Sequence, residues 1–203
     1  QELHDGVWYH ATSVDEAMRM IPLVIADIDQ GIIENVLTGG IDVGRTHDLT
    51  EFAITGKSDG DRHPLRFSIS LENVGFDDQE ACLCEIINTL PISCVLVDKN
   101  GIGMQLAENL EMKTGKAQGV DFTNATKELW AVEARVQAGR GNTPLPTDRD
   151  TAYQIHSIKK FVTSAKNNRF DTERNEKHHA DKFWAWALSI WAAGKSGPYI
   201  LAI

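Results

Sequence analysis

Residues 39–54, GGIDVGRTHDLTEFAI, place a carboxylate inside an apolar strand pattern. Apolar residues on both sides of Asp42 predict two strands, at 40–44 and 49–55, around a glycine-containing turn. A strand core rarely holds a carboxylate, because a buried charge without a partner is costly. We therefore expect a group near Asp42 that compensates its charge.

The sequence beyond this stretch predicts a mixed α/β domain. A half-buried strand is expected at 64–72, where apolar and polar residues alternate, and an apolar strand at 93–98 ends on Asp98. The full expected order is three strands, a helix, a strand, a helix, a strand and three helices. Short turns make the leading strands antiparallel, whereas strand–helix–strand units are parallel with right-handed crossovers. This is the order of the ribonuclease H-like fold, in which the first and fourth strands are neighbours at the centre of a mixed sheet flanked by helices.

Two helical patterns have less certain limits. Apolar residues at helical spacing follow residue 14, and Pro22 is expected to interrupt them. The loop-forming composition of 139–150 precedes a further helix marked by Ile155, Ile158 and Val162. The stretch 180–191 is apolar nearly all round, which predicts a buried helix.

Composition limits the class of protein. The 203 residues suffice for one globular domain, and no run approaches the roughly 18 apolar residues of a membrane span. The three cysteines form no disulfide framework or zinc motif. The net charge of −9 argues against a simple phosphate-binding protein. It is compatible with a metal-dependent nuclease, because bound cations reverse the local field of an acidic site.

Three aspartates are candidate metal ligands. Asp42 and Asp98 lie on strands expected to be neighbours, and Asp181 begins the buried helix. Carboxylates brought together repel one another, and two divalent cations about 3.5–4 Å apart can relieve this and bind a phosphodiester for attack by water. Each aspartate also has an ordinary alternative: a turn or cap for Asp98, a helix N-terminal acid for Asp181. Asp42 is the hardest to explain without a cation.

Further charged residues are weaker candidates. Asp48 is either a fourth metal ligand or a turn residue. Candidate DNA contacts, for which solvated surface charge is the simpler alternative, are Lys127, Arg140, Arg149 and His179.

Four stretches in this order resemble the C-terminal nuclease domain of tailed-phage terminase large subunits, the DNA-packaging motors. They are GGIDVGRTHDLTEFAI, VLVDKNGIGMQLAENL, VDFTNATKELWAVEARVQAGRGNTPLPTD and HHADKFWAWALSIWA. The resemblance implies a ribonuclease H-like endonuclease that cuts concatemeric double-stranded viral DNA during genome packaging. It implies two Mg²⁺ or Mn²⁺ ions held by Asp42, Asp98 and Asp181, a less firm role for Asp48, and Lys127 near the cleft.

The resemblance also sets the expected domain organisation. The ATPase half of such motors carries a G-x-x-x-x-G-K-[ST] loop, which this sequence lacks. We therefore expect residues 1–36 to be an approach segment or the remnant of an interdomain linker, and residues 37–203 to be the nuclease domain. The implied partners are double-stranded DNA, the ATPase half, the portal and the small terminase subunit, in the cytoplasm of the host cell and without a membrane.

Three other functions remain open. A different nuclease of the same fold, such as a junction resolvase or a transposase-like enzyme, would prefer a different DNA substrate. An actin-like or sugar-kinase-type phosphotransferase also uses Asp-x-Gly after a strand, but needs two such domains. A non-catalytic scaffold would bind no metal at Asp42.

Overall fold

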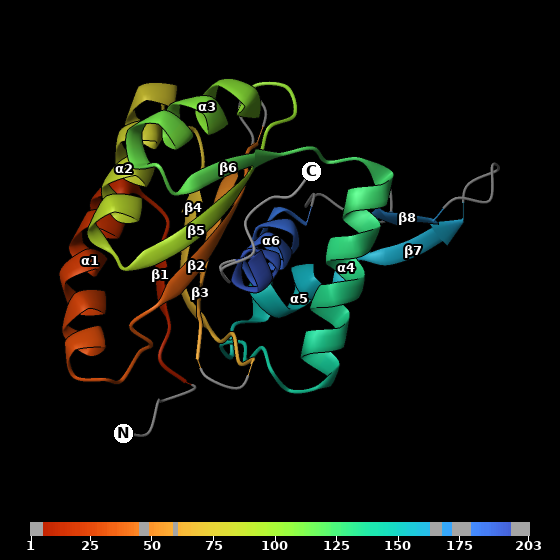
Figure 1. Ribbon diagram of the computed structural model, residues 1–203, viewed down its shortest axis with the longest axis horizontal. Coiled ribbons are helices and arrows are strands. Elements are labelled where there is room, and N and C mark those ends of the chain that lie inside the picture. Colours follow the sequence, from red (N-terminus) through yellow and green to blue (C-terminus); the bar gives the residue numbers. More distant parts are fainter. Residues whose placement is uncertain (1–5, 45–48, 59–60, 163–167, 172–179, 196–203) are drawn as a thin grey trace.

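The structure, a computed structural model, describes residues 6–44, 49–58, 61–162, 168–171 and 180–195. A six-stranded sheet with the order β1-β4-β3-β2-β5-β6 lies between two layers of helices (Figure 1). The strands are β1 (Tyr9–Ala11), β2 (Leu37–Asp42), β3 (Thr50–Gly56), β4 (Leu65–Leu71), β5 (Ile92–Asp98), β6 (Ala117–Val120), β7 (Lys159–Val162) and β8 (Asn168–Asp171). The helices are α1 (Val14–Asp29), α2 (Phe76–Thr89), α3 (Gly103–Thr114), α4 (Asn124–Gly139), α5 (Arg149–Ser157) and α6 (Asp181–Lys195).

The pairing of the strands confirms the ribonuclease H-like topology. Strands β2, β3 and β4 are antiparallel, and β5 and β6 are added in parallel beside β2. The pairing of β2 with β5 places the first and fourth predicted strands side by side at the centre of the sheet. The expected fold class is therefore correct.

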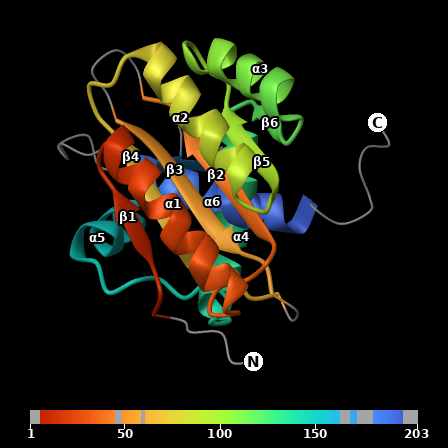
Figure 2. The same ribbon diagram turned by 90° about the vertical axis from the view of Figure 1, so that its left-hand side faces the viewer.

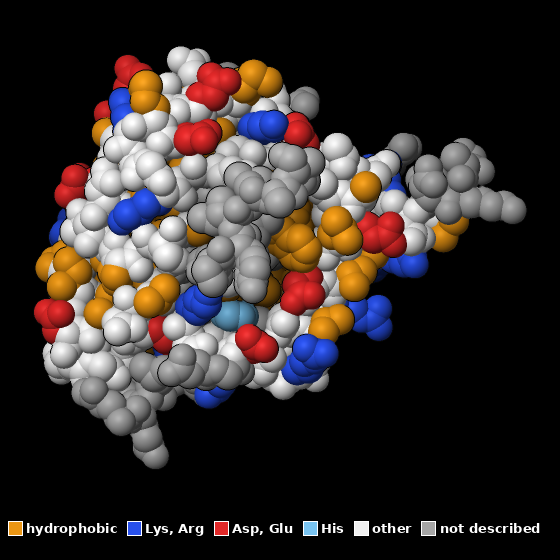
Figure 3. Space-filling view, viewed as in Figure 1, with side chains coloured by type: hydrophobic (Ala, Val, Ile, Leu, Met, Phe, Trp, Pro, Cys, Tyr) orange, Lys and Arg blue, Asp and Glu red, His pale blue; other side chains and the backbone are white. Residues whose placement is uncertain are grey.

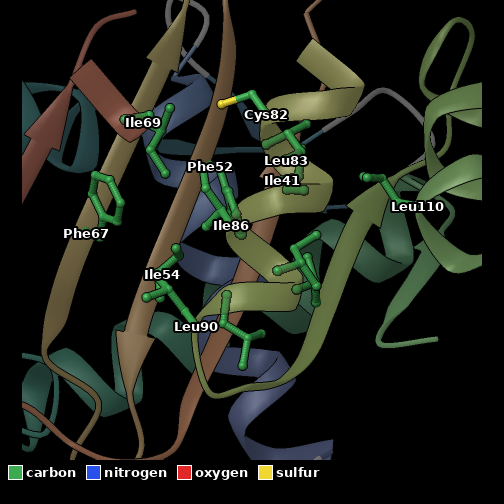
Figure 4. Packing of buried hydrophobic residues seen from close by; sticks show 14 of the residues in the cluster. Ile41, Phe52, Ile54, Phe67, Ile69, Cys82, Leu83, Ile86, Leu90 and Leu110 are labelled. Atoms are coloured by element: carbon green, nitrogen blue, oxygen red, sulfur yellow. The ribbon is translucent and has the colours of Figure 1, made fainter. Parts of the chain in front are cut away.

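Each face of the sheet has its own hydrophobic cluster. Helices α1, α2 and α3 cover one face (Figure 2), where Ile41, Phe52 and Leu83 belong to one cluster (Figure 4). Helices α4 and α6 pack on the other face through a second cluster that contains Trp130 and Trp184. Because both faces are covered, every residue of β4 is buried, and the expectation of a half-buried strand there is wrong.

Two helix boundaries also differ from expectation. Helix α1 continues through Pro22, because its buried face packs in the core on both sides of the proline and outweighs the lost hydrogen bond. Helix α5 begins at Arg149, where the Asp148 side chain accepts a hydrogen bond from the Thr151 amide, and it ends at Ser157. Residues after it pair with β8 as strand β7, so the predicted helix does not reach Val162.

The N-terminal segment joins the sheet. Strand β1, which the sequence did not predict, pairs in parallel with β4. The assignment of 1–36 as an interdomain remnant stays a prediction. Within the described residues, no helix is long and apolar enough to span a bilayer.

Candidate active site

Two of the predicted ligands lie at the carboxyl ends of neighbouring strands. Ile41 of β2 is in register with Val97 of β5, so the next residues, Asp42 and Asp98, end the two central strands side by side. Both aspartates are only 8% exposed. This edge of an open α/β sheet, outside the carboxyl ends of its strands, is where such folds bind ligands.

Helix α6 brings the third aspartate to the same edge. Asp181 is its first residue, and Thr38 Oγ1 of β2 donates a hydrogen bond of 3.0 Å to the carbonyl oxygen of Ser189, two turns further on. The absence of a side chain at Gly40 permits this packing, since a Cβ there would lie 2.5 Å from the Ser189 amide nitrogen. The helix therefore runs along β2 with its N-terminus beside Asp42.

The pKa of Asp42 reflects its burial and the nearness of the other two aspartates. Burial raises the pKa of Asp42 well above its ordinary value, and the negative charges of Asp181 and Asp98 raise it further. The nearby Lys127 ammonium lowers the same pKa. Among the described residues, none donates a hydrogen bond to the Asp42 carboxylate.

The side chains at this edge suit a metal ion by the chemistry of their donor atoms, but they do not form a complete coordination site. Within the described parts of the chain, no three His, Cys, Asp or Glu side chains lie close enough together to hold an ion as they stand. The donors are nevertheless carboxylate oxygens, which hard divalent cations prefer, and one of them is buried and destabilised by its neighbours. Asp98 also accepts a 2.9 Å hydrogen bond from the Asn100 amide, so its turn-forming role is real.

Glu51 is a fourth carboxylate at this edge that sequence reasoning missed. It lies directly opposite Asp42 on β3, and cross-strand partners point to the same face of a sheet. Glu51 is 1% exposed, accepts a 2.7 Å hydrogen bond from Ser70 Oγ, and has a pKa that burial raises to about 8. The available signal was a second acidic residue within an apolar strand pattern.

The structure places some of the candidate DNA-binding residues nearer to Asp42 than others. Lys127, in the first turn of α4, lies with its Nζ 4.7 Å from the centroid of the Trp184 ring and near enough to Asp42 to influence it. Arg149 begins α5, whose second residue Asp150 pairs with Lys182 of α6. Arg140 follows the opposite end of α4, so the structure does not bring it to Asp42. Asp48 and His179 lie outside the described residues.

The surface in Figure 3 has acidic and basic side chains interspersed, and that face shows no continuous basic stripe. Together with the net charge of −9, this predicts weak binding of the isolated chain to DNA.

Comparisons with known proteins bear on the fold. No protein-family model matches the sequence, and no curated protein matches it. The large terminase nuclease of the thermophilic phage G20c, solved with bound magnesium, superposes with a TM-score of 0.67 at 18% identity, over 77% of this chain and 80% of that one. The nuclease domain of the large terminase of Thermus phage P74-26 gives a TM-score of 0.60 at 15% identity, over 76% and 77% of the two chains. The HK97 bacteriophage large terminase gives a TM-score of 0.57 at 14% identity, over 76% of this chain and 38% of the HK97 chain. The chain therefore has the ribonuclease H-like fold of phage large terminase nucleases, and the resemblance inferred from the sequence is confirmed at the level of the fold.

Proposed function

We propose that this chain is a metal-dependent endonuclease that cuts concatemeric double-stranded DNA during viral genome packaging, the nuclease half of a terminase large subunit. The observation that carries the proposal is that Asp42 and Asp98 end neighbouring central strands and that Asp181 and Asp98 lie near enough to raise the pKa of Asp42. The fold shared with phage large terminase nucleases supports it.

In this proposal the three aspartates would together hold two metal ions. Asp42 and Asp98 would hold one Mg²⁺ or Mn²⁺ ion, and Asp42 and Asp181 would hold a second. Such ions supply an activated water and stabilise charge on the leaving oxygen. The bound magnesium, cobalt and zinc in structures of the G20c nuclease support the use of divalent cations. Lys127 would contribute positive charge beside a scissile phosphate.

The same proposal assigns the domain organisation, the partners and the location of the chain. Residues 37–203 would be the nuclease domain, and the preceding segment, whose β1 and α1 pack on its sheet, would lead in from an ATPase half. The portal and the small terminase subunit would bring the duplex to the site in the host cytoplasm, which would compensate for the acidic charge of the chain. The alternative, another ribonuclease H-like nuclease such as a junction resolvase, predicts a preference for branched over linear DNA.

The test is cleavage of supercoiled plasmid with Mg²⁺, Mn²⁺, Ca²⁺ or EDTA. We expect nicking and linearisation with Mg²⁺ or Mn²⁺, and none with EDTA or in Asp42→Asn and Asp181→Asn. Asp121→Asn is the matched control, because the Asp121 side chain is 61% exposed and pairs with Lys99. Undiminished cleavage by Asp42→Asn would exclude the proposed site. If the unchanged chain cuts nothing, calorimetry with Mn²⁺ decides between a nuclease that needs its motor, which binds the ion, and a scaffold, which does not.

A further inference from the structure

A small cavity lies behind the candidate site, between β3, α5 and α6. Its volume is about 10 Å³, and its lining includes Glu51, Thr151, Lys182 and Trp186. This is the lower limit of the space that one water molecule needs, roughly 10–15 Å³. The cavity has room for one water molecule and for nothing larger.

One buried polar atom in the lining, the Trp186 indole nitrogen, has no hydrogen-bond partner among the described residues, and Trp186 is 2% exposed. The Thr151 hydroxyl, on a residue that is 3% exposed, lies against the Asp148 carboxylate. A buried indole N–H without an acceptor costs about 1–3 kcal/mol, and buried polar groups in proteins are nearly always paired with protein atoms or ordered water. Trp186 is on α6 and Thr151 is on α5, so one water molecule in the cavity would give the indole N–H an acceptor and join the two helices.

Glu51 supplies a further polar group to this cavity. One of its oxygens accepts from Ser70 Oγ, and its carboxylate interacts electrostatically with Lys182 and with Asp42 on the neighbouring strand β2. A water molecule there could accept from the Trp186 N–H and donate to Thr151 Oγ1 and Glu51. Three hydrogen bonds are typical of a buried structural water.

The first turn of α6 contacts α5 beside this cavity. Lys182, the residue after Asp181, donates through its amide to Gln154 Oε1 at 3.3 Å and through its ammonium to Asp150 Oδ2 at 2.6 Å. Trp186 lies one turn further along the same face. Ala180, just before the helix, has a φ of 56°, a left-handed conformation that costs a non-glycine residue of the order of 1–2 kcal/mol. External contacts must hold this turn in place.

We infer that the cavity binds one internal water and that Glu51 and this water fix the first turn of α6, so that Glu51 is a positioning residue for Asp181. The importance of Glu51 to catalysis rests on the proposed function, whereas the hydration site and the support of α6 do not. Glu51 acts here through hydrogen bonds beneath the site and is not itself a metal ligand.

The first test uses the metal-free protein. A high-resolution crystal structure is expected to show an ordered water within hydrogen-bond distance of Trp186 Nε1 and Thr151 Oγ1. Thr151→Val should remove it and raise the hydrogen-exchange rates of the Trp184 and Ala185 amides about tenfold, because the first turn opens more often. The matched control is Thr143→Val, since the Thr143 hydroxyl is likewise buried but does not line this cavity. A dry cavity, or unchanged exchange in Thr151→Val, overturns the inference.

The second test separates positioning from ligation. Glu51→Ala should weaken Mn²⁺ binding about tenfold or more, as expected for the loss of an outer support of a metal ligand, while Glu51→Gln should restore most of the affinity. Equal losses in both variants would make Glu51 a ligand and would contradict its positioning role. If α6 is loosened as expected but the unchanged protein binds no Mn²⁺, the support of α6 stands and the proposed nuclease function fails.

Discussion

Gly40 of β2 and Ala185 of α6 are in backbone contact: a Cβ atom on Gly40 would lie 2.1 Å from the Ala185 carbonyl oxygen. Because Ala185 is one turn after Asp181, this contact determines how far along β2 the helix begins. The distance between two candidate metal ligands, Asp42 and Asp181, therefore depends on a glycine that touches no substrate.

Gly40→Ala should lower the free energy of unfolding by about 1–3 kcal/mol or more, because the atoms in its way are mainly backbone and cannot rotate aside. Urea denaturation measures the effect. Gly139→Ala is the control, since nothing lies within 4 Å of a Cβ at that helical position and alanine favours helix. Equal stability of Gly40→Ala and the unchanged protein would show that β2 and α6 are not in backbone contact.

Asp42→Asn should make the metal-free protein more stable while abolishing cleavage. The pKa of Asp42 is raised by burial and by two neighbouring carboxylates, so its charged form is disfavoured in the folded state. Each unit of such a shift corresponds to about 1.4 kcal/mol. We expect a higher melting temperature at pH 8 in EDTA and no further rise with Mn²⁺. A melting temperature below that of the unchanged protein would contradict the buried, repelled carboxylate.

Glu51→Gln should change how stability depends on pH. Burial raises the pKa of Glu51 from 4.5 to about 8, so the folded state binds its proton more tightly than the unfolded state. The stability that this proton contributes is complete below about pH 4.5 and is lost as the pH rises through about 8. Relative to the unchanged protein, Glu51→Gln should therefore gain up to about 5 kcal/mol between pH 5 and 9 in EDTA.

The same unfolding curves at several pH values provide the check for Glu51. Asp42 is present in both proteins, so its own titration cancels to first order in the difference. A stability difference that stays constant with pH would mean that Glu51 has an ordinary pKa.

Glu34→Gln should lower the free energy of unfolding by about 3–5 kcal/mol. The Arg66 side chain is fully buried, and its Nε and Nη2 donate to the two Glu34 oxygens at 2.7 and 2.9 Å. The substitution removes the buried negative charge that both of these guanidinium nitrogens bind. Lys99→Met is the control, because the side chains of Lys99 and its partner Asp121 are 37% and 61% exposed and their pairing should contribute less than about 1 kcal/mol. Similar losses in the two variants would contradict this difference.

The central part of the site could be predicted because it follows from local rules. Element order alone makes β2 and β5 neighbours, so Asp42 and Asp98 end side by side. The position of Asp181 was inferred from the buried helix that it begins and from the resemblance, whereas its physical basis, the contact at Gly40, joins segments far apart in the sequence and could not be predicted. Glu51 was missed because its relation to Asp42 depends on the register of the β2–β3 pair, which a turn of uncertain length does not determine.

The region between 149 and 171 shows where local patterns are ambiguous. Ile155, Ile158 and Val162 fit a helical spacing, yet the chain leaves α5 after Ser157 and forms a two-stranded ribbon. Short apolar spacings of this kind do not distinguish a helix from a strand. The cap at Asp148 was the better guide, because it marks the start of a short helix.

The position of α6 after all six strands of the main sheet has a consequence for biosynthesis. Domains begin to fold from their N-terminal parts while synthesis continues. The sheet and its α1–α3 layer can form while the C-terminal helix is still inside the ribosome, and at that stage Asp42 and Asp98 lack their third partner. If the proposed function holds, a nascent or C-terminally shortened chain lacks the third carboxylate, and cutting activity would appear only once translation has passed Asp181.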